Sequence, residues 1–446
     1  MAHEKMAQHV SLWRDFLSKN QKIEFVWVQL LSYSGKSLIR MIPVVSFDVM
    51  VRQNLSLPFP KAALCHLPGT CHVLPQSMSG PSRLVPDLAT LYPQAGSDGT
   101  RAVVIPYCAD KSGKRLPECP RSRLEALCEM LQKEMGYSAL IGIEVEVVFV
   151  KLDEHNGTPA YKTVNHDHSW SSMTIEDRSF LHVIEAVVRA LMDVDVRLVQ
   201  FHAETAPGQW EFVLPPSPPI QAADVFIKTR DTIRDVAAEF GLHATFYPRI
   251  SPNDYGTGSH AHISLQHEGE GNPATCEAFF SGILAHLPSI LAFTLPRQES
   301  YDRIGNGIRA GGDFVGWGWE NKETPLRRIE ENHFEFRLLD GFANPFLALL
   351  SIFAAGISGI KRGLILPPEA GSLVQTECLS KEHHSHSIPL PKVLEESLDS
   401  LGTDKDLRDM IGPEIVQSYI PTKLAEEESM KRWSASRRKQ WLISEY

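Results

Sequence analysis

The sequence predicts a chain of two domains, the second built from both helices and strands, and three observations support this. At 446 residues the chain is too long for one small core. A charged turn at 110–115 and a proline-bearing stretch at 117–120 separate two different patterns. Before them, short strands and loops dominate. Beyond them, strands alternate with helices, which is typical of an α/β or α+β domain.

The elements predicted in the first part are short. Residues 7–18 carry apolar side chains at helical spacing, which predicts an amphipathic helix. Residues 22–31 alternate as a strand does, and a Ser-Gly turn at 34–35 leads to a second strand through Ile42, so we predict a hairpin. Further along we predict a loop-rich stretch and a buried strand, at 44–100 and 101–107.

The second part is predicted to contain long helices between shorter strands. Each helix is an extended stretch of apolar residues at helical spacing, and the strand-like segments between them are rich in Val, Ile and Phe. The predicted helices lie at 121–135, 175–194, 221–241, 272–295 and 344–360, with a strand at 243–250. We place the domain boundary near 110–120.

Composition limits the classes of partner. The formal net charge of −10 argues against a nucleic-acid partner, because such partners favour basic surfaces. No apolar run approaches the roughly 20 residues of a membrane span. Residues 1–6 lack the apolar core of a secretion signal. The 7 cysteines are few, scattered and odd in number, as expected for reduced thiols in an intracellular protein. We therefore expect a cytoplasmic protein without nucleic-acid or membrane partners.

Four strand-like segments carry ionisable side chains. Side chains alternate faces along a strand, so residues two apart project from the same face while their apolar neighbours pack on the other. The Pro-Gly pair at 207–208 predicts a turn that brings the two glutamates flanking it side by side. The residues concerned are Glu144 and Glu146, Glu204 and Glu211, His260, His262 and Ser264, and Glu335 and Arg337.

These ionisable groups predict a metal site. A lone Glu-x-Glu is usually a solvated edge, and a lone His-x-His is usually a pair of satisfied histidines. Charged groups on strands this apolar are costly unless something neutralises them, and here four such segments occur together. Hard divalent ions, bound by several oxygens and an occasional imidazole, would neutralise them. We expect more than one ion.

A cationic stretch between residues 303 and 337 complements the carboxylates. Guanidinium groups suit bidentate capture of carboxylates and phosphates, and together with a metal cluster they suit phosphoryl transfer from a nucleotide. A solvated surface is the alternative, which is plausible for Arg309 or Arg328 alone. Neither the common phosphate loop nor a dinucleotide-binding glycine motif is present. The stretch contains Arg303, Arg309, Lys322, Arg327, Arg328 and Arg337.

In their order and spacing, these motifs resemble those of the glutamine synthetase family over nearly the whole chain. The resemblance rests on 142–146, 204–211, 256–265, Arg303 in Ser-Tyr-Asp-Arg, Glu-Phe-Arg at 335–337, and Asn-Pro-Phe-Leu at 344–347. It implies an α+β fold with an N-terminal β-grasp-like domain over 1–115. Residues 116–446 would form a catalytic domain with a curved antiparallel sheet and flanking helices. A homo-oligomeric ring with active sites between subunits is also implied.

Matched residue by residue, the resemblance implies two Mg or Mn ions and ATP as co-substrate. One ion would be held by Glu146, Glu204 and Glu211, and the second by Glu144, His260 and Glu335. The nucleotide would lie beside His262 and Ser264, with Lys322 and Arg327 at its phosphates. Substrate would contact Gly256, Arg303 (a spectator carboxylate) and Arg337 (the carboxylate that is activated). In the implied reaction ATP phosphorylates a carboxylate, and an amine then displaces phosphate to form an amide.

Departures from the family pattern redirect the expected substrate. Lys322 stands where arginine is usual, and Tyr255 where a substrate-binding asparagine is typical. Arg309 replaces a glutamate that helps to deprotonate ammonium, and an arginine stays protonated and cannot be that base. The ammonium-binding aspartate motif is not found in 44–80. We therefore expect an ATP-dependent carboxylate–amine ligase that joins glutamate or a similar acid to an organic amine. The alternative is a binding or regulatory protein that kept the fold and lost turnover.

Overall fold

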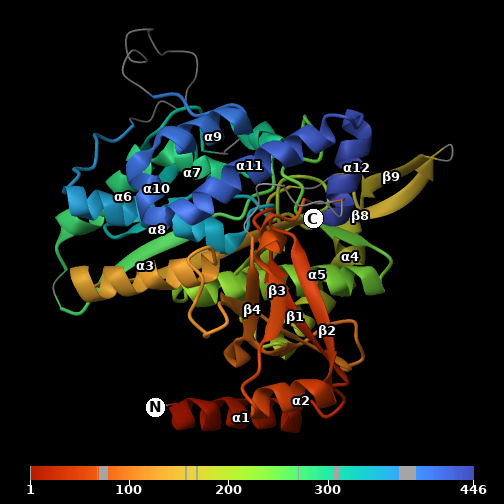
Figure 1. The fold of residues 1–446 in the computed structure, drawn as a ribbon. Helices are drawn as coiled ribbons and strands as arrows, with labels where there is room; N and C mark the ends of the chain where they lie inside the picture. Colours follow the sequence, from red (N-terminus) through yellow and green to blue (C-terminus); the bar gives the residue numbers. More distant parts are fainter. Residues whose placement is uncertain are drawn as a thin grey trace.

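The computed structural model describes residues 2–67, 69, 79–155, 158–166, 169–269, 271–305, 311–370 and 388–446. Within these residues the strands form three sheets, of four, three and nine strands. The two smaller sheets lie within residues 25–109 and the large sheet within 137–336. The large sheet and its helices form the bulk of the molecule in Figure 1, and the small sheets lie below them. No described sheet combines strands from both sides of the predicted domain boundary, and the boundary itself stays a prediction.

The N-terminal part is a hairpin packed against helices. Strands β1 (Phe25–Leu31) and β2 (Ser37–Pro43) are antiparallel and joined by a turn with Gly35 at φ +76°, which confirms the predicted hairpin. The other edge of β1 pairs in parallel with β6 (Arg101–Val104). Helix α1 (Ala2–Lys19), predicted at 7–18, buries its one tryptophan completely.

Two predictions in this part were wrong. The stretch 44–100 is not simply loop: it begins with helix α2 (Val44–Arg52), which forms because Phe47 and Val51 pack into the core one turn apart. It also contains three short strands, β3 (Leu57–Pro60), β4 (Pro81–Pro86) and β5 (Tyr92–Pro93). The predicted strand 101–107 is divided after β6, since the chain leaves for a different sheet at β7 (Pro106–Ala109).

The large sheet is organised around one long strand, β8 (Tyr137–His155). It lies between β11 (Gln209–Val213) and β13 (Ala261–His267), antiparallel to both. The order across the sheet is β10-β11-β8-β13-β16-β15-β14, and only β14 and β15 run parallel to each other. Two short strands, β12 (His243–Thr245) and β9 (Thr158–Thr163), pair with the C-terminal part of β8. The remaining members are β10 (Gln200–Ala203), β14 (Trp317–Trp319), β15 (Leu326–Glu330) and β16 (His333–Phe336).

The helices confirm most of the predicted pattern. Helices α3 (Pro120–Met135), α4 (Ile175–Asp193), α5 (Pro219–Glu239) and α8 (Pro345–Arg362) match predicted ranges to within two residues. The helix predicted at 272–295 is instead broken into α6 (Pro273–Ala285) and α7 (Leu287–Thr294), which meet at a bend of 74°. Pro288 in the first turn of α7 explains the break, because proline lacks the amide hydrogen that a continuous helix needs. Helices α9 to α12 follow at Leu394–Thr403, Lys405–Ile411, Pro413–Met430 and Ala435–Glu445.

Helix α8 lies at the centre of the helical layer. By length and composition it could cross a membrane, but 83% of it is buried inside the protein. Gly356 and Gly359 let it approach α6 closely, since a Cβ on Gly359 would come within 2.1 Å of the carbonyl oxygen of Ala278. We interpret α8 as the core helix of this layer, because it packs against α3, α5, α6, α7 and α10.

Candidate active site

The charged side chains of β8 lie on one face of the sheet and its apolar side chains on the other. Ile143, Val145 and Val147 are buried in the hydrophobic core, as the alternation predicts. Glu146 lies opposite Glu211 of β11, and the backbone amide of Glu144 donates to the carbonyl of His260. Residues that are far apart in the sequence therefore meet beside the middle of β8.

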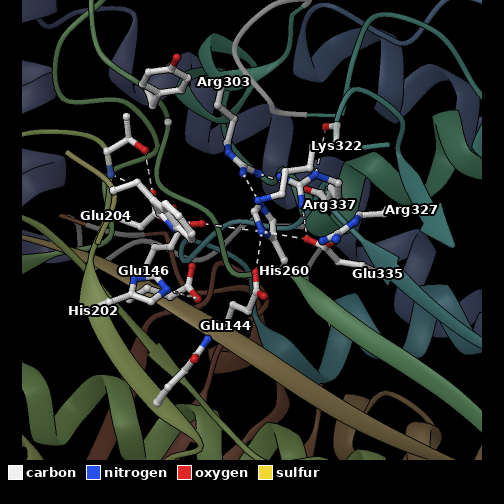
Figure 2. A pocket seen from close by; sticks show the side chains of 16 residues that line it. Glu144, Glu146, His202, Glu204, His260, Arg303, Lys322, Arg327, Glu335 and Arg337 are labelled. Carbon is white, nitrogen blue, oxygen red and sulfur yellow. Dashed lines mark hydrogen bonds and ion pairs between the residues drawn. The ribbon is translucent and has the colours of Figure 1, made fainter. Parts of the chain in front are cut away.

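These side chains line a pocket of about 190 Å³ that contains most of the predicted site. Figure 2 shows the imidazole of His260 near its centre, with Glu146 and Glu204 on one side and Glu144 below. Arg327, Arg337 and Lys322 lie on the other side together with Glu335, and Arg303 lies above. The predicted residues that line it are Glu144, Glu146, Glu204, Glu211, Gly256, His260, Arg303, Lys322, Arg327, Glu335 and Arg337. Their roles stay predictions.

One group of candidate metal ligands joins β8, β13 and β16. Glu144, His262 and Glu335 each offer a ligand atom, and these atoms all lie within 4.8 Å of one another. Glu144 interacts with both histidines, His262 Nε2 at 3.0 Å and His260 Nδ1 at 3.0 Å. Burial alone would raise the pKa of Glu144, but the two histidine hydrogen bonds outweigh it and hold that pKa well below its usual range.

The second group lies on the β10–β11 hairpin. His202, Glu204 and Glu211 offer atoms within the same 4.8 Å limit. The predicted turn brings the two glutamates together: the Glu204 amide donates to the carbonyl of Gln209, and Gly208 has φ +72°. A Cβ on Gly208 would meet the carbonyl oxygen of Phe149 at 2.8 Å, so the turn needs glycine for both shape and space.

The electrostatics of these carboxylates favour bound cations. Burial, reinforced by neighbouring glutamates, raises the pKa of Glu146 to about 8 and that of Glu211 to about 10. Burial is the larger cause of both shifts, and the neighbouring glutamates add an excess of negative charge that also disfavours the ionised forms. Divalent ions would remove this excess, and clustered carboxylate oxygens with imidazole nitrogens suit Mg or Mn. The residues present therefore fit the predicted ions.

Cations on β15 and just beyond β16 face the carboxylates. Glu335, which is fully buried, accepts from the guanidinium of Arg337 and, at 3.0 Å, from Arg327 Nη1 on the adjacent strand. Arg327 is also paired with Glu320. Arg337 Nε donates to the carbonyl of Lys322 at 3.2 Å, which ties the loop before β15 to this wall. Positive charge is thus fixed on one side of the pocket before any substrate binds.

Backbone carbonyls bind Arg303, and two glycines leave room for its side chain. Arg303 is 2% exposed, and Nη1 donates to the carbonyls of Arg337 and Leu339 at 3.3 and 3.1 Å. A Cβ on Gly258 would come within 2.5 Å of its Nη2, and one on Gly256 within 2.9 Å of its Cβ. The Gly-Thr-Gly segment before β13 therefore leaves the space that the arginine occupies. Its Nε is buried and has no hydrogen-bond partner among the residues that the structure describes.

Sequence reasoning missed several residues of the pocket. His202 is two residues before Glu204, so the strand period that identified the other pairs would also have placed His202 on this face. Gln209 does not line the pocket but supports it, since it donates to Glu146 Oε2 at 2.8 Å and to the carbonyl of Gly256 at 3.0 Å. It is two residues before Glu211, so the same strand period would have placed it on this face. Trp170 lines the pocket mouth, with its ring 6.0 Å from that of His202.

Two predicted nucleotide residues lie apart from the rest. His262 is not among the pocket-lining residues, although it contacts Glu144 and lies 2.9 Å from His333 Nε2. Ser264, two residues further along β13, is paired with His333 at the backbone and does not line the pocket. Arg309, on which the choice of amine over ammonia rests, lies outside the described residues.

Comparison with known proteins identifies the family. A family model of the glutamine synthetase catalytic domain matches residues 117–442. Protein fluG of Emericella nidulans is 38% identical over 443 residues, which cover 98% of this chain but 50% of fluG, so the chain spans half the length of that relative. The glutamine synthetase of Methanocaldococcus jannaschii is 30% identical over 373 residues, 77% of this chain and 78% of the relative.

Two further matches are a third relative in sequence and a solved structure with the same fold. The gamma-glutamylpolyamine synthetase GlnA3 of Streptomyces coelicolor is 30% identical over 374 residues, 80% of this chain and 79% of the relative. A solved structure of a GmaS/ADP complex superposes with a TM-score of 0.80 at 21% identity, over 96% of this chain and 98% of that chain. The predicted α+β fold is thereby confirmed. The chain belongs to the glutamine synthetase family, whose members are ATP-dependent ligases that use divalent metal ions.

Proposed function

We propose that this chain is an ATP-dependent ligase that joins a carboxylic acid, glutamate or a similar acid, to an organic amine through an acyl phosphate. The observation that carries the proposal is the pocket itself. Two ligand groups of carboxylate and imidazole face a wall of fixed cations across one cavity. Phosphoryl transfer to a carboxylate brings several negative oxygens together, and this arrangement can hold them.

Each cation has a proposed task. Arg303 binds the carboxylate that does not react, since its buried Nε has a hydrogen bond left to make. Arg337 holds the carboxylate that is activated, and Lys322 and Arg327 hold phosphate oxygens. Divalent ions bound by the carboxylates would neutralise phosphate charge. The strands fix these groups before substrate arrives, so little reorganisation accompanies the reaction.

The reaction has two steps. A carboxylate oxygen of the acid attacks the γ-phosphorus of ATP, the new O–P bond forms, and the bond to ADP breaks. The amine nitrogen then attacks the carbonyl carbon of the acyl phosphate, the C–O bond to phosphate breaks, and the nitrogen loses a proton. Charge builds on oxygens that Arg327 and Arg337 already face.

An organic amine is proposed as nucleophile in place of ammonia. Arg309 stands where the family has a proton-accepting glutamate, and an amine that arrives partly neutral needs that base less than ammonium does. The relative GlnA3, whose name records polyamine as substrate, shows that the family contains such ligases. The same change at Arg309 also favours the second candidate function, a binding or regulatory protein without turnover.

A phosphate-release screen separates the two candidates. The full chain is mixed with ATP, Mg²⁺, one of several acids and one of a panel of amines or ammonium, and the product mass is measured. We expect phosphate release that depends on the amine, together with the mass of the new amide, and neither in Arg337→Ala. ATP binding without turnover for any pair would instead support the regulatory function.

The proposed assembly is a homo-oligomeric ring with active sites between subunits. It rests on family membership, and light scattering of the native protein tests it. A clean monomer with full ligase activity would contradict sites shared between subunits.

A further inference from the structure

A second cavity, of about 660 Å³, lies between the four-stranded sheet and helix α5. Trp27 and Gln29 of β1 and Tyr92 of β5 line one side, and Asp231 and Asp235 of α5 line the other. It shares no lining residue with the pocket described above. Figure 1 shows α5 beside the strands of the small sheet. The cavity therefore lies where the N-terminal part meets the helical layer.

Two carboxylates on α5 face this cavity. Asp231 and Asp235 are one turn apart, a spacing at which like charges repel and weaken a helix. A side-chain amide of the opposite sheet binds each: Gln29 donates to Asp231 Oδ2 at 2.7 Å, and Gln94 to Asp235 Oδ2 at 2.9 Å. Among the described residues neither carboxylate has an ion pair. The charge of Arg234 acts on both carboxylates without forming an ion pair with either. A partly buried pair of anions with one cation near both retains negative charge that a cationic ligand could neutralise.

Further polar atoms around the cavity also lack partners. Tyr92 is 3% exposed, and its buried hydroxyl makes no hydrogen bond to any residue that the structure describes. Within the same described ranges the buried Oε1 atom of Gln94 has no partner either, although the amide nitrogen of that side chain donates to Asp235. Buried polar groups in proteins are nearly always hydrogen-bonded. An amide oxygen only accepts and a hydroxyl accepts as well as donates, so the missing partner carries N–H or O–H donors.

The nearby cations are engaged elsewhere. Arg101 lies over the ring of Trp27, 5.0 Å from its centroid, and Lys228 over that of Tyr92 at 5.3 Å. Lys228 also donates to the carbonyl of Val194 at 2.6 Å. Arg230, one turn before Arg234 on α5, donates to the carbonyl of Gly341 at 2.7 Å. Burial and the charge of Arg234 lower the pKa of His243, which also lines the cavity, and this favours its neutral form. Of the described residues that line the cavity, Arg234 is the one permanent cation, and its contact to the carbonyl of Ser444 is long, at 3.4 Å.

We propose that this cavity is a binding site for a small molecule that carries a primary ammonium group. The ammonium would lie between Asp231 and Asp235, with the free oxygen of Gln94 and the hydroxyl of Tyr92 accepting its remaining hydrogens. Arg234, on the same wall, could hold a carboxylate at the other end of the ligand. Two classes of small molecule carry such an ammonium group: a simple diamine, and an amino acid. The site is separate from the ligase pocket and does not depend on the proposed reaction.

Calorimetric titration of the full chain with two matched probes tests the site. The probes are 1,4-diaminobutane and 4-aminobutyrate, which have the same length and differ in whether the second end is an ammonium or a carboxylate. We expect at least one probe to bind, and Asp235→Asn to weaken it at least tenfold. Tyr92→Phe should weaken binding less, and it serves in place of Asp235→Asn if that variant fails to fold.

Three further variants locate the site and its ligand. Glu239→Gln, an exposed position on the same helix, is the matched control and should bind like the native chain. Glu146→Gln alters the ligase pocket and should leave this binding intact. Arg234→Gln should weaken 4-aminobutyrate alone, which would identify an amino acid as the source, and an unchanged result would favour a diamine. Absence of binding by both probes, or binding that Glu146→Gln abolishes and Asp235→Asn does not, would overturn the proposal.

Discussion

The Nε2 atom of His260 lies 3.2 Å from Nη2 of Arg303. A guanidinium has hydrogens on every nitrogen and accepts nothing, so Nε2 must accept and the ring proton must sit on Nδ1. Nδ1 in turn lies 3.0 Å from Glu144 Oε2 and 3.3 Å from Glu335 Oε1. Burial, together with the charge of Arg337, lowers the pKa of His260 to about 4, so the ring is neutral at pH 7.

This relationship predicts that a divalent ion tightens binding of the acid substrate. An ion held by Nδ1 would displace its proton, and the neutral ring would then carry its proton on Nε2, where it would oppose the N–H of Arg303. Arg303 would be released towards the pocket. We expect saturating Mn²⁺ to tighten glutamate binding by about fivefold or more, a typical coupling between sites. In Arg303→Ala this gain should disappear, and equal affinity of the native chain with and without Mn²⁺ would contradict the coupling.

A second prediction concerns the ions themselves. Glu146→Gln and Glu335→Gln should each weaken Mn²⁺ binding at least tenfold, because each removes a negative oxygen from a cluster that has an excess of them. Calorimetric titration of metal-free protein measures this. Glu24→Gln, at an exposed position far from the pocket, is the control and should change nothing. If both site variants bind Mn²⁺ as the native chain does, the ligand assignment is wrong.

A third prediction concerns the space beside Arg303. A Cβ at position 258 would lie 2.5 Å from Arg303 Nη2 and 2.7 Å from His260 Nε2, so Gly258→Ala must displace both. We expect a loss of about 1–3 kcal/mol in the free energy of unfolding, as for overpacking in a core, and weaker substrate binding. Gly402→Ala in α9 is the matched control, since nothing lies within 4 Å of its Cβ. That variant should unfold at the same or a higher denaturant concentration.

A fourth prediction follows from Asp235, whose pKa is raised to about 6 by burial and the nearby Asp231. The folded protein holds this proton more tightly than the unfolded chain. The group therefore contributes stability that is fully present at low pH and is lost as the pH rises through about 6. Between about pH 4 and 7, Asp235→Asn should lose about 1–3 kcal/mol less unfolding free energy than the native chain. Denaturant titrations at both pH values measure it, and a steeper loss in the variant would contradict the assignment.

The part of the site that the sequence predicted is the part that follows strand alternation. Glu144 and Glu146 are two apart on one strand, and the turn at Gly208 sets the spacing of Glu204 and Glu211, so local rules suffice. Alternation places Gln209 on the face of Glu211, but its contacts to Glu146 and Gly256 depend on how β8 and the segment before β13 lie beside β11. The pairing of His262 with Glu144 likewise depends on strand order, which a local pattern does not contain.

The fold shows the same division. Helix α8 was predictable from its continuous apolar pattern and the Asn-Pro start, and Asn344 does accept from the amides of Phe346 and Leu347. Helix α2 was missed because the surrounding Pro, Ser and Gly dominated the composition, whereas burial of Phe47 and Val51 decides the structure. The sequence did contain a signal for the break before α7, because Pro288 is typical of the first turn of a helix and not of its interior.

Strand β8 has a consequence for synthesis of the protein. Strand β8 pairs with β13, which begins about 105 residues after β8 ends, and long-range pairings of this kind form late in folding. At ribosomal rates of 5–20 residues per second, β8 emerges roughly five seconds or more before β13 exists. During that time its 19 residues present open strand edges to other chains. The unneutralised carboxylates that later face substrate would repel a second nascent copy, and so protect the chain from aggregation before they serve the site.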